Sequence, residues 1–296
     1  MGTLVGHVAP GLAFFVIGLW HMFNHTKLHA LNPNTSYTSP LWFPCTKFRY
    51  AELLLIMASS AASIIMELFV GPQKHQPLDS DGTIPTNHLH NFEHASISLA
   101  IFVYAALVIV LDRARPKAPR ILAYLLASVA FAQELLLFVL HSTDHRGTEG
   151  HYHLFLQLII FVSLVTTLMG IGFPTSFAVG FVRSLSIFFQ GVWFIFLGVM
   201  LYTPRLLPKG CFLYEVDGHT LIKCPQEKAL RRAKSLITLE FSWCFVGVAF
   251  FGVSLYLVMA KIYGDDKVDY FPLGTKEVEH EAGDEYSDDY DVESPK

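Results

Sequence analysis

Residues Ala132–His153 read AQELLLFVLHSTDHRGTEGHYH and decide how the rest of the chain is interpreted. One apolar run ends here, a short polar connection follows, and a second apolar run begins. Glu134 lies inside the first run. Around the connection stand side chains that bind metals or carry protons, namely His141, Asp144, His145, His151 and His153. The stretch therefore predicts two long helices joined by a turn rich in chemically active groups.

The composition of the chain indicates that lipid is its solvent. Of 296 residues, 52% are hydrophobic and 16% are charged, against roughly 25% charged in an ordinary soluble domain. The mean hydropathy is +0.42, and so few charges cannot cover a soluble surface. The net charge of -4 shows no basic excess, which argues against a nucleic-acid partner. Four cysteines are too few for a disulfide framework.

Seven apolar segments are long enough to cross a membrane, which takes about 20 residues per helix. We expect these helices at Thr3–Phe23, Tyr50–Val70, Asn91–Leu111, Arg120–His141, Tyr152–Phe173, Ser184–Tyr202 and Ser235–Ile262. The first segment lacks a basic start and a cleavage site, so we interpret it as a retained helix with a kink at Pro10. The predicted fold class is all-α, a polytopic bundle of seven transmembrane helices over residues 1–262.

The lysines and arginines of the loops predict the orientation. The first, third and fifth loops share one side with the tail and carry Lys27, Lys47, Arg49, Arg113, Arg115, Lys117 and Arg183. The second and fourth loops carry only Lys74 and Arg146. We therefore expect an exoplasmic N-terminus and a cytosolic C-terminus in an endomembrane or the plasma membrane. The long basic sixth loop and two glycosylation sequons in the first loop argue the other way. In this orientation Cys211 and Cys224 of the sixth loop can pair in an oxidising lumen.

The tail, residues 263–296, changes composition abruptly. It is acidic and short of aliphatic side chains, which predicts a disordered cytosolic segment. Its residues Tyr270-Phe271-Pro272-Leu273 fit the Tyr-x-x-apolar pattern that endosomal sorting adaptors bind. The tail therefore predicts an adaptor as a partner, with Tyr270 and Leu273 as the contact residues.

The polar residues of the predicted helices gather at one end of the bundle. Ionisable groups inside a membrane are costly, so each is a candidate for function. Because successive helices alternate in direction, the candidate metal ligands fall at the same end, namely His7, His94, His141, His145 and His153. Glu67 and Glu134 at that end are the candidate catalytic carboxylates. Imidazole together with carboxylate suits zinc or iron.

The spacing of these groups limits their roles. His90 and His94 are four residues apart, as are His141 and His145, and residues at this spacing share a helix face. Glu134 lies seven residues before His141, or roughly 10 Å along a helix at 1.5 Å per residue. We therefore expect Glu134 to support the site as an acceptor or proton carrier. The competing interpretation is a structural Glu–His hydrogen bond between helices.

The opposite end has a different character in the sequence. His21, His25 and His29 follow one another at intervals of four. The apolar run has ended by Asn24, so we expect a solvated or headgroup-facing stripe and not a metal site. The inner half of the helices shows almost no ionisable residues.

Two further polar features receive structural interpretations. Gln190, Gly191 and Trp193 place an amide and a small residue in the sixth helix, which favours a close helix contact. Glu240 lies about one turn into the seventh helix, where it too is interpreted as a helix contact.

Several spaced motifs resemble the transmembrane protein 45 family. They are the Gly6-His7 opening with Pro10-Gly11, Asn91-x-x-His94, Glu134 followed by His141, His151-x-His153, and Arg183 followed by Gln190-Gly191-x-Trp193. The resemblance is to plant members, spans most of residues 1–262, and implies a seven-helix membrane protein without a settled activity. Animal members have a His after the seventh-helix Trp, where this chain has Cys244 after Trp243. Glu240 is the candidate substitute for that His.

Three functions stay open on the sequence alone. The first is a non-catalytic membrane protein with a receptor-like or trafficking role. The second is a zinc- or iron-dependent membrane enzyme, such as a hydrolase, acting on a lipid-like substrate. The third is a proton or metal-ion carrier, which the one-sided distribution of polar groups disfavours. Membrane lipids and a second copy of the chain in a homodimer are the other expected partners.

Overall fold

The computed structural model describes residues 4–31, 37–72, 75–144, 147–216 and 219–264, without the side chains of 141–144, 215, 216 and 219–221. Contacts between Cα atoms separate residues 1–264 from residues 265–296. The tail with Tyr270 and Leu273 lies outside the described residues.

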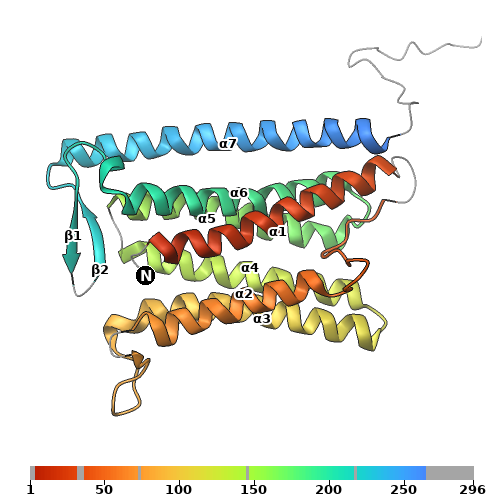
Figure 1. The fold of residues 1–296 in the computed structure, drawn as a ribbon, viewed down its shortest axis with the longest axis horizontal. Helices are drawn as coiled ribbons and strands as arrows, with labels where there is room; N and C mark the ends of the chain where they lie inside the picture. Colours follow the sequence, from red (N-terminus) through yellow and green to blue (C-terminus); the bar gives the residue numbers. More distant parts are fainter. Residues whose placement is uncertain (1–3, 32–36, 73–74, 145–146, 217–218, 265–296) are drawn as a thin grey trace, which may run out of the picture. The chain divides into compact units, whose positions relative to one another are not determined.

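Among the described residues, seven helices are long and apolar enough to cross a membrane, which confirms the predicted all-α fold (Figure 1). They are α1 (Leu4–Leu31), α2 (Ala51–Ile65) with the π-helical turn η1 (Met66–Val70), α3 (Leu89–Ala114) preceded by η3 (Thr86–His88), α4 (Pro119–Asp144), α5 (Thr148–Gly172), α6 (Phe177–Tyr202) and α7 (Glu227–Tyr263). A short turn, η4 (Pro204–Leu206), follows α6. The chain is therefore a multi-pass membrane protein.

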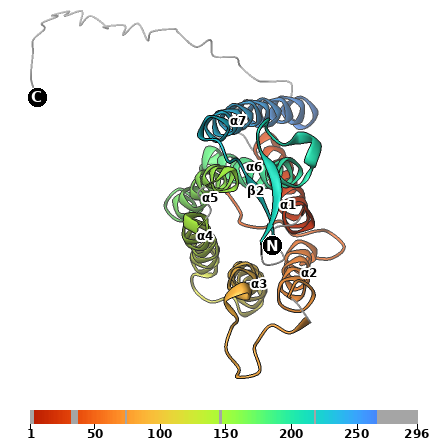
Figure 2. The same cartoon turned by 90° about the vertical axis from the view of Figure 1, so that its left-hand side faces the viewer.

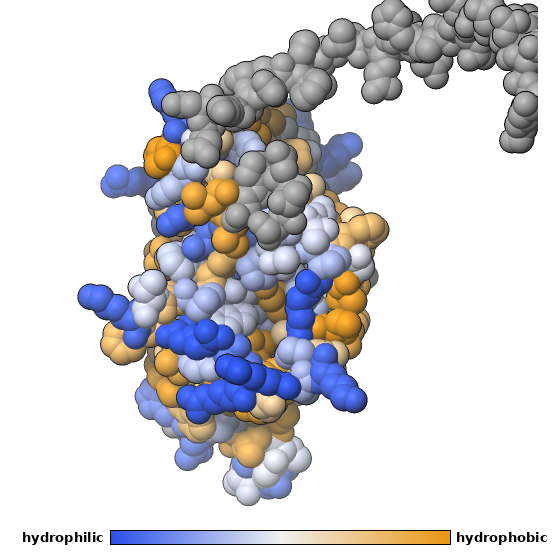
Figure 3. All heavy atoms as spheres, turned by 90° about the vertical axis from the view of Figure 1, so that its right-hand side faces the viewer, coloured by the Kyte–Doolittle hydropathy of each residue, from blue (hydrophilic) through white to orange (hydrophobic). Residues whose placement is uncertain are grey.

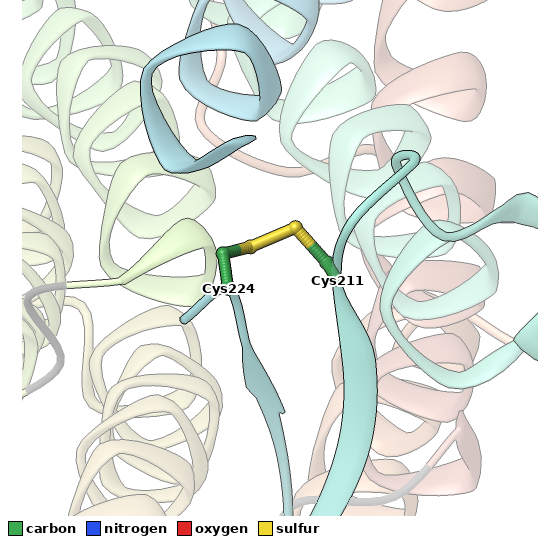
Figure 4. Close-up of a disulfide and its surroundings, with 2 residues drawn as sticks. All are labelled: Cys211 and Cys224. Atoms are coloured by element: carbon green, nitrogen blue, oxygen red, sulfur yellow. A yellow bond between two sulfur atoms is a disulfide. The ribbon is translucent and has the colours of Figure 1, made fainter. Parts of the chain in front are cut away.

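A β-hairpin in the loop between α6 and α7 was not predicted. Strands β1 (Phe212–Val216) and β2 (His219–Lys223) pair antiparallel, with Phe212 opposite Lys223. The sequence carries a signal for it, because Asp-Gly between two runs of alternating polarity favours a two-residue hairpin turn. A disulfide joins Cys211, just before β1, to Cys224, just after β2 (Figure 4). It closes the hairpin at the end nearest the helices.

The helix α1 is longer than the predicted Thr3–Phe23. It passes through Pro10 and continues to Leu31. Polar residues in its second half form hydrogen bonds within the helix. Thr26 Oγ1 donates to the Met22 carbonyl at 2.8 Å, and Asn24 Nδ2 donates to the Trp20 carbonyl at 2.8 Å. The apolar pattern ends earlier than the helix because these residues face neighbouring helices instead of lipid.

The helices α1 and α6 form the closest interface of the bundle. A Cβ atom on Gly18 would overlap the backbone of Phe188, and one on Gly191 would overlap the backbone of Phe15. Glycine lets two backbones approach closely in a membrane, where dispersion contacts replace the hydrophobic effect. Trp193 is fully buried in the core beside this contact, and its Nε1 donates to the Tyr152 carbonyl at 3.0 Å.

The outer faces of the helices are apolar. Exposed side chains such as Trp243, Phe250 and Leu257 on α7 are 60% or more accessible, as expected where lipid is the solvent. Figure 3 looks onto the end of the bundle where α1 and α7 finish, and hydrophilic residues project from that end between apolar flanks. Viewed along their axes, α1 to α6 are arranged in a ring, whereas α7 lies outside it (Figure 2).

Candidate functional site

A cavity of about 910 Å³ lies between the helices α1 to α6. Its wall is mainly apolar and includes Pro10, Ile56, Ile101 and Phe138. Small hydroxyl groups interrupt the apolar surface at Ser59, Ser60, Ser63 and Ser98. Ionisable groups stand at both ends, with His7, Glu67, His94, Glu149 and His153 toward the start of α1 and with His21 and Arg183 toward its end. An apolar space with few polar groups is the usual form of a small-molecule site.

One group of side chains at the first end has the composition of a metal site. A ligand atom from each of His7, Glu149 and His153 lies within 4.8 Å of the other two. His7 comes from the first turns of α1, and Glu149 and His153 come from the first turns of α5. His7 and His153 are buried, with exposed fractions of 6% and 2%, and Glu149 is partly buried. We call these three residues the histidine–glutamate cluster.

A second group at the same end joins α2 to α3. The carboxylate of Glu67, in the turn η1, accepts a hydrogen bond of 2.9 Å from Asn91 Nδ2. Its other oxygen lies 3.4 Å from His94 Nδ1. Turns of π-helix are frequent at functional sites because they displace one side chain from the regular helical row. The contact also fits a structural link between helices.

The helix α4 contributes Glu134 to the middle of the cavity wall. Its side chain is 1% exposed and accepts a hydrogen bond from Gln190 Nε2 on α6. Glu240 on α7 lies outside the cavity lining and accepts a hydrogen bond of 2.9 Å from Tyr152 Oη on α5. Of these two carboxyl groups, only Glu134 is placed to meet a molecule inside the cavity.

The structure regroups the predicted metal ligands. His7 and His153 come together with Glu149, which was not among the predicted ligands, whereas His94 lies beside Glu67. A signal for Glu149 exists in the sequence, because it stands four residues before His153, the spacing at which side chains share a helix face. The side chain of His141 and the whole of His145 lie outside the described residues.

The prediction of a solvated or headgroup-facing histidine stripe at the opposite end is wrong. His21 and His25 are buried, with exposed fractions of 5% and 0%, because α1 continues past Phe23 and packs against α2 and α6. His21 Nε2 lies 2.7 Å from Glu52 Oε1. Arg183, which we expected in a loop, lies inside α6 and is 1% exposed. The half of the bundle at the C-terminal end of α1 therefore contains buried ionisable groups that the hydropathy pattern did not predict.

These buried groups form a connected network. Arg183 Nη2 lies 3.3 Å from His25 Nε2, and His25 Nδ1 lies 2.8 Å from Tyr37 Oη. Since a guanidinium only donates hydrogen bonds, Nε2 accepts and the ring proton is on Nδ1, from which it is donated to Tyr37. Burial raises the pKa of Tyr37 to about 12, so its phenol stays protonated at neutral pH.

Comparison with known families finds a match in the second half of the chain. Residues 120–257 match the model of a family described as a family of unknown function (DUF716). Over these residues the chain is similar to this family. The match confirms the predicted resemblance to the transmembrane protein 45 family. The DUF716 segment includes Glu134, Glu149, His153 and Arg183, whereas His7 lies before it. The family description assigns no activity.

Proposed function

We propose that this protein is a metal-dependent membrane enzyme that acts on a lipid-like molecule held in the cavity between its helices. The observation that carries the proposal is the histidine–glutamate cluster at the end of that cavity. Two imidazoles and one carboxylate are the donor set of many catalytic zinc sites and of non-haem iron oxygenases. Both kinds of site keep coordination positions open for chemistry.

The geometry of the cluster fits one ion with little adjustment. Ligand atoms bound to the same zinc at about 2.0–2.2 Å lie at most roughly 4 Å apart. The three atoms here lie within 4.8 Å of one another, so they need to draw together by less than about 1 Å. His7 and His153 come from different helices, so the positions of α1 and α5 in the bundle set the geometry. A bound zinc or iron ion would supply Lewis acidity.

The chain's own residues have separate tasks in this proposal. The apolar wall orients a lipid-like substrate and excludes water from the end nearest Phe138. Glu67, held by Asn91 and His94, is the proposed proton acceptor at the same end. Glu134 is the proposed polar contact for the middle of the substrate. The cation-carrier alternative is less well supported, because a permanently charged arginine on the cavity wall repels cations.

Elemental analysis of the detergent-purified protein tests the proposal. We expect about one zinc or iron per chain in the wild type. His153→Ala should lose the metal, and His151→Ala should keep it, because His151 Nε2 lies 3.1 Å from Thr238 Oγ1 on α7 instead. The two variants differ by two positions on one helix, which makes His151→Ala a matched control.

The proposal fails if the folded wild type holds no metal, or if His153→Ala retains it. Screening of long-chain esters and amides with the metal-loaded protein then tests for the reaction. A metal-free, folded protein would favour the non-catalytic role, in which the adaptor motif at Tyr270 and a homodimer stay predictions.

A further inference from the structure

Arg183 is an unusual group at its position in the fold. It lies in the second turn of α6, is 1% exposed, and lines the cavity. A guanidinium does not lose its proton in proteins, so this side chain places a full positive charge inside the membrane-spanning bundle. Such a charge is costly unless something compensates it.

The partners of Arg183 are all neutral. Nη1 donates to Tyr124 Oη at 3.0 Å, and Nη2 donates to the Pro40 carbonyl at 2.6 Å and to Ser39 Oγ at 3.2 Å. The fourth partner is the neutral ring of His25. Nε is buried and has no hydrogen-bond acceptor among the described residues. We call Arg183 with these four partners the arginine cluster.

The carboxylate of Glu52, on the neighbouring helix α2, is already occupied. Glu52 accepts hydrogen bonds from Trp20 Nε1 at 2.9 Å and from the backbone nitrogen of Phe43 at 2.8 Å, and it pairs with His21. Within the described part of the chain, no carboxylate oxygen forms an ion pair with Arg183 at 4.0 Å or less. The charge of Arg183 thus lacks a direct counter-ion there.

The cavity gives a counter-ion room to reach Arg183. Its wall runs from His7 to His21 along α1, which are fourteen residues apart, or about 21 Å at 1.5 Å per residue. One leaflet of a bilayer contributes roughly 15 Å of a hydrocarbon core about 30 Å thick. An extended acyl chain therefore fits between the two ends, along a wall that is mainly apolar.

We propose that Arg183 binds the anionic head group, a carboxylate or a phosphate, of a long-chain amphiphile whose tail lies in the cavity. The tail points toward the histidine–glutamate cluster. The anion site stands on the arginine cluster and the cavity alone. That the same molecule is the substrate rests on the proposed function, and its reacting group would then lie about 20 Å from its anionic group.

Binding measurements on the purified full chain in a non-ionic detergent test the inference. Palmitate and hexadecanol share a chain and differ in charge, and acetate and inorganic phosphate are anions without a chain. We expect the wild type to bind palmitate at least about tenfold more tightly than hexadecanol, because hydrogen bonds to charged groups are the strong ones. Acetate and inorganic phosphate should neither bind comparably nor displace palmitate.

Single substitutions test whether Arg183 produces the preference for palmitate over hexadecanol. Arg183→Lys keeps the charge and loses the planar donor array, so the preference for palmitate should fall severalfold, whereas Arg205→Lys at an exposed position should leave it unchanged. Equal affinities for palmitate and hexadecanol in the wild type would overturn the anion site, whatever the variants do. Binding of inorganic phosphate as tightly as palmitate would overturn the amphiphile.

The metal-free His153→Ala protein separates this inference from the proposed function. It should keep the preference for palmitate, because the arginine cluster lies at the other end of the cavity. Metal in the wild type without a palmitate preference refutes only the anion site. A palmitate preference in a wild type that holds no metal refutes only the metal-dependent enzyme.

Discussion

The two ends of the cavity are built in different ways. The histidine–glutamate cluster takes its three side chains from the first turns of α1 and α5. The arginine cluster ties α6 to α1, to α4 and to the segment around Ser39 through hydrogen bonds of 2.6–3.3 Å. The first has the donor set of a metal site, and the second is a cross-linked network around a fixed charge. Buried polar groups in one bundle thus offer potential metal ligands at one end and a fixed charge held by hydrogen bonds at the other.

Substitution in the interface between α1 and α6, which aligns the two ends, should cause the largest loss of stability. Gly18→Leu forces a side chain into the backbone of Phe188 and separates α1, which carries His7 and His21, from α6, which carries Arg183. Overpacking costs 1–3 kcal/mol and occasionally more, and with no room to relax here we expect a loss of about 3 kcal/mol or more.

Denaturant titration in detergent, followed by tryptophan fluorescence, measures this loss of stability. Metal and palmitate binding are measured on the same variant. Gly247→Leu is the control, because a Cβ atom added at this position of α7 would meet no described atom within 4 Å. Retention of full stability and of both binding activities in Gly18→Leu would show that the two ends do not depend on this interface.

Removal of the central side chain at each end should have unequal consequences for stability. Arg183→Ala deletes hydrogen bonds to Tyr124, Ser39 and Pro40, and charge-assisted bonds contribute about 1.5–3 kcal/mol each in favourable cases. Since partners in a membrane partly re-form in the unfolded state, we expect a net loss of about 2–3 kcal/mol.

In the metal-free protein, His153→Ala should lower the free energy of unfolding by less than Arg183→Ala does. The same titration in the presence of a chelator measures both. An equal loss would mean that the histidine–glutamate cluster is itself a structural cross-link, and the contrast between the two ends would disappear.

Lowering the pH should weaken metal binding at one end of the cavity and leave anion binding at the other end unchanged, without any substitution. Imidazole binds metal only when neutral. Metal affinity should therefore fall as the pH is lowered, because protons compete with the metal for the imidazole nitrogens. The preference for hexadecyl sulfonate over hexadecanol should stay constant, because neither the sulfonate nor the guanidinium of Arg183 titrates as the pH is lowered.

Equilibrium dialysis against zinc and a parallel lipid-binding titration check this pair of expectations. A sulfonate preference that disappears together with the metal would indicate that one set of histidines controls both ends. His25 and His21 of the opposite end would then be the residues to substitute first.

The smallest effect is expected at the outer rim of the bundle, next to the arginine end. Arg49 makes two hydrogen bonds of 2.9 Å to Asp112, and Asp112 raises the pKa of Arg49. The Arg49 side chain is 56% exposed, and exposed ion pairs contribute little to stability and are screened by salt. Arg49→Ala should thus lower the free energy of unfolding only slightly, and the difference should vanish in high salt. A loss comparable to that of Arg183→Ala would show that the buried position of an arginine is not what distinguishes the two.

The sequence by itself determined the class of the protein and its helices. Seven apolar runs with few charges can only be satisfied as membrane helices, because lipid offers the backbone no hydrogen-bond partners. The motifs around Glu134, Arg183 and Trp193 also predicted the family that matches residues 120–257. These conclusions depend on local composition and spacing, which a linear pattern contains.

Only the tertiary structure decided which polar side chains meet. His7 and His153 are distant in sequence, and they converge with Glu149 because of how α1 and α5 are placed in the bundle. Arg183 and His21 look like loop or headgroup residues in a hydropathy pattern, yet hydrogen bonds from neighbouring helices allow α1 and α6 to carry them into the interior. Hydropathy measures the preference of one residue for water, whereas the burial of a charge depends on partners that folding brings to it.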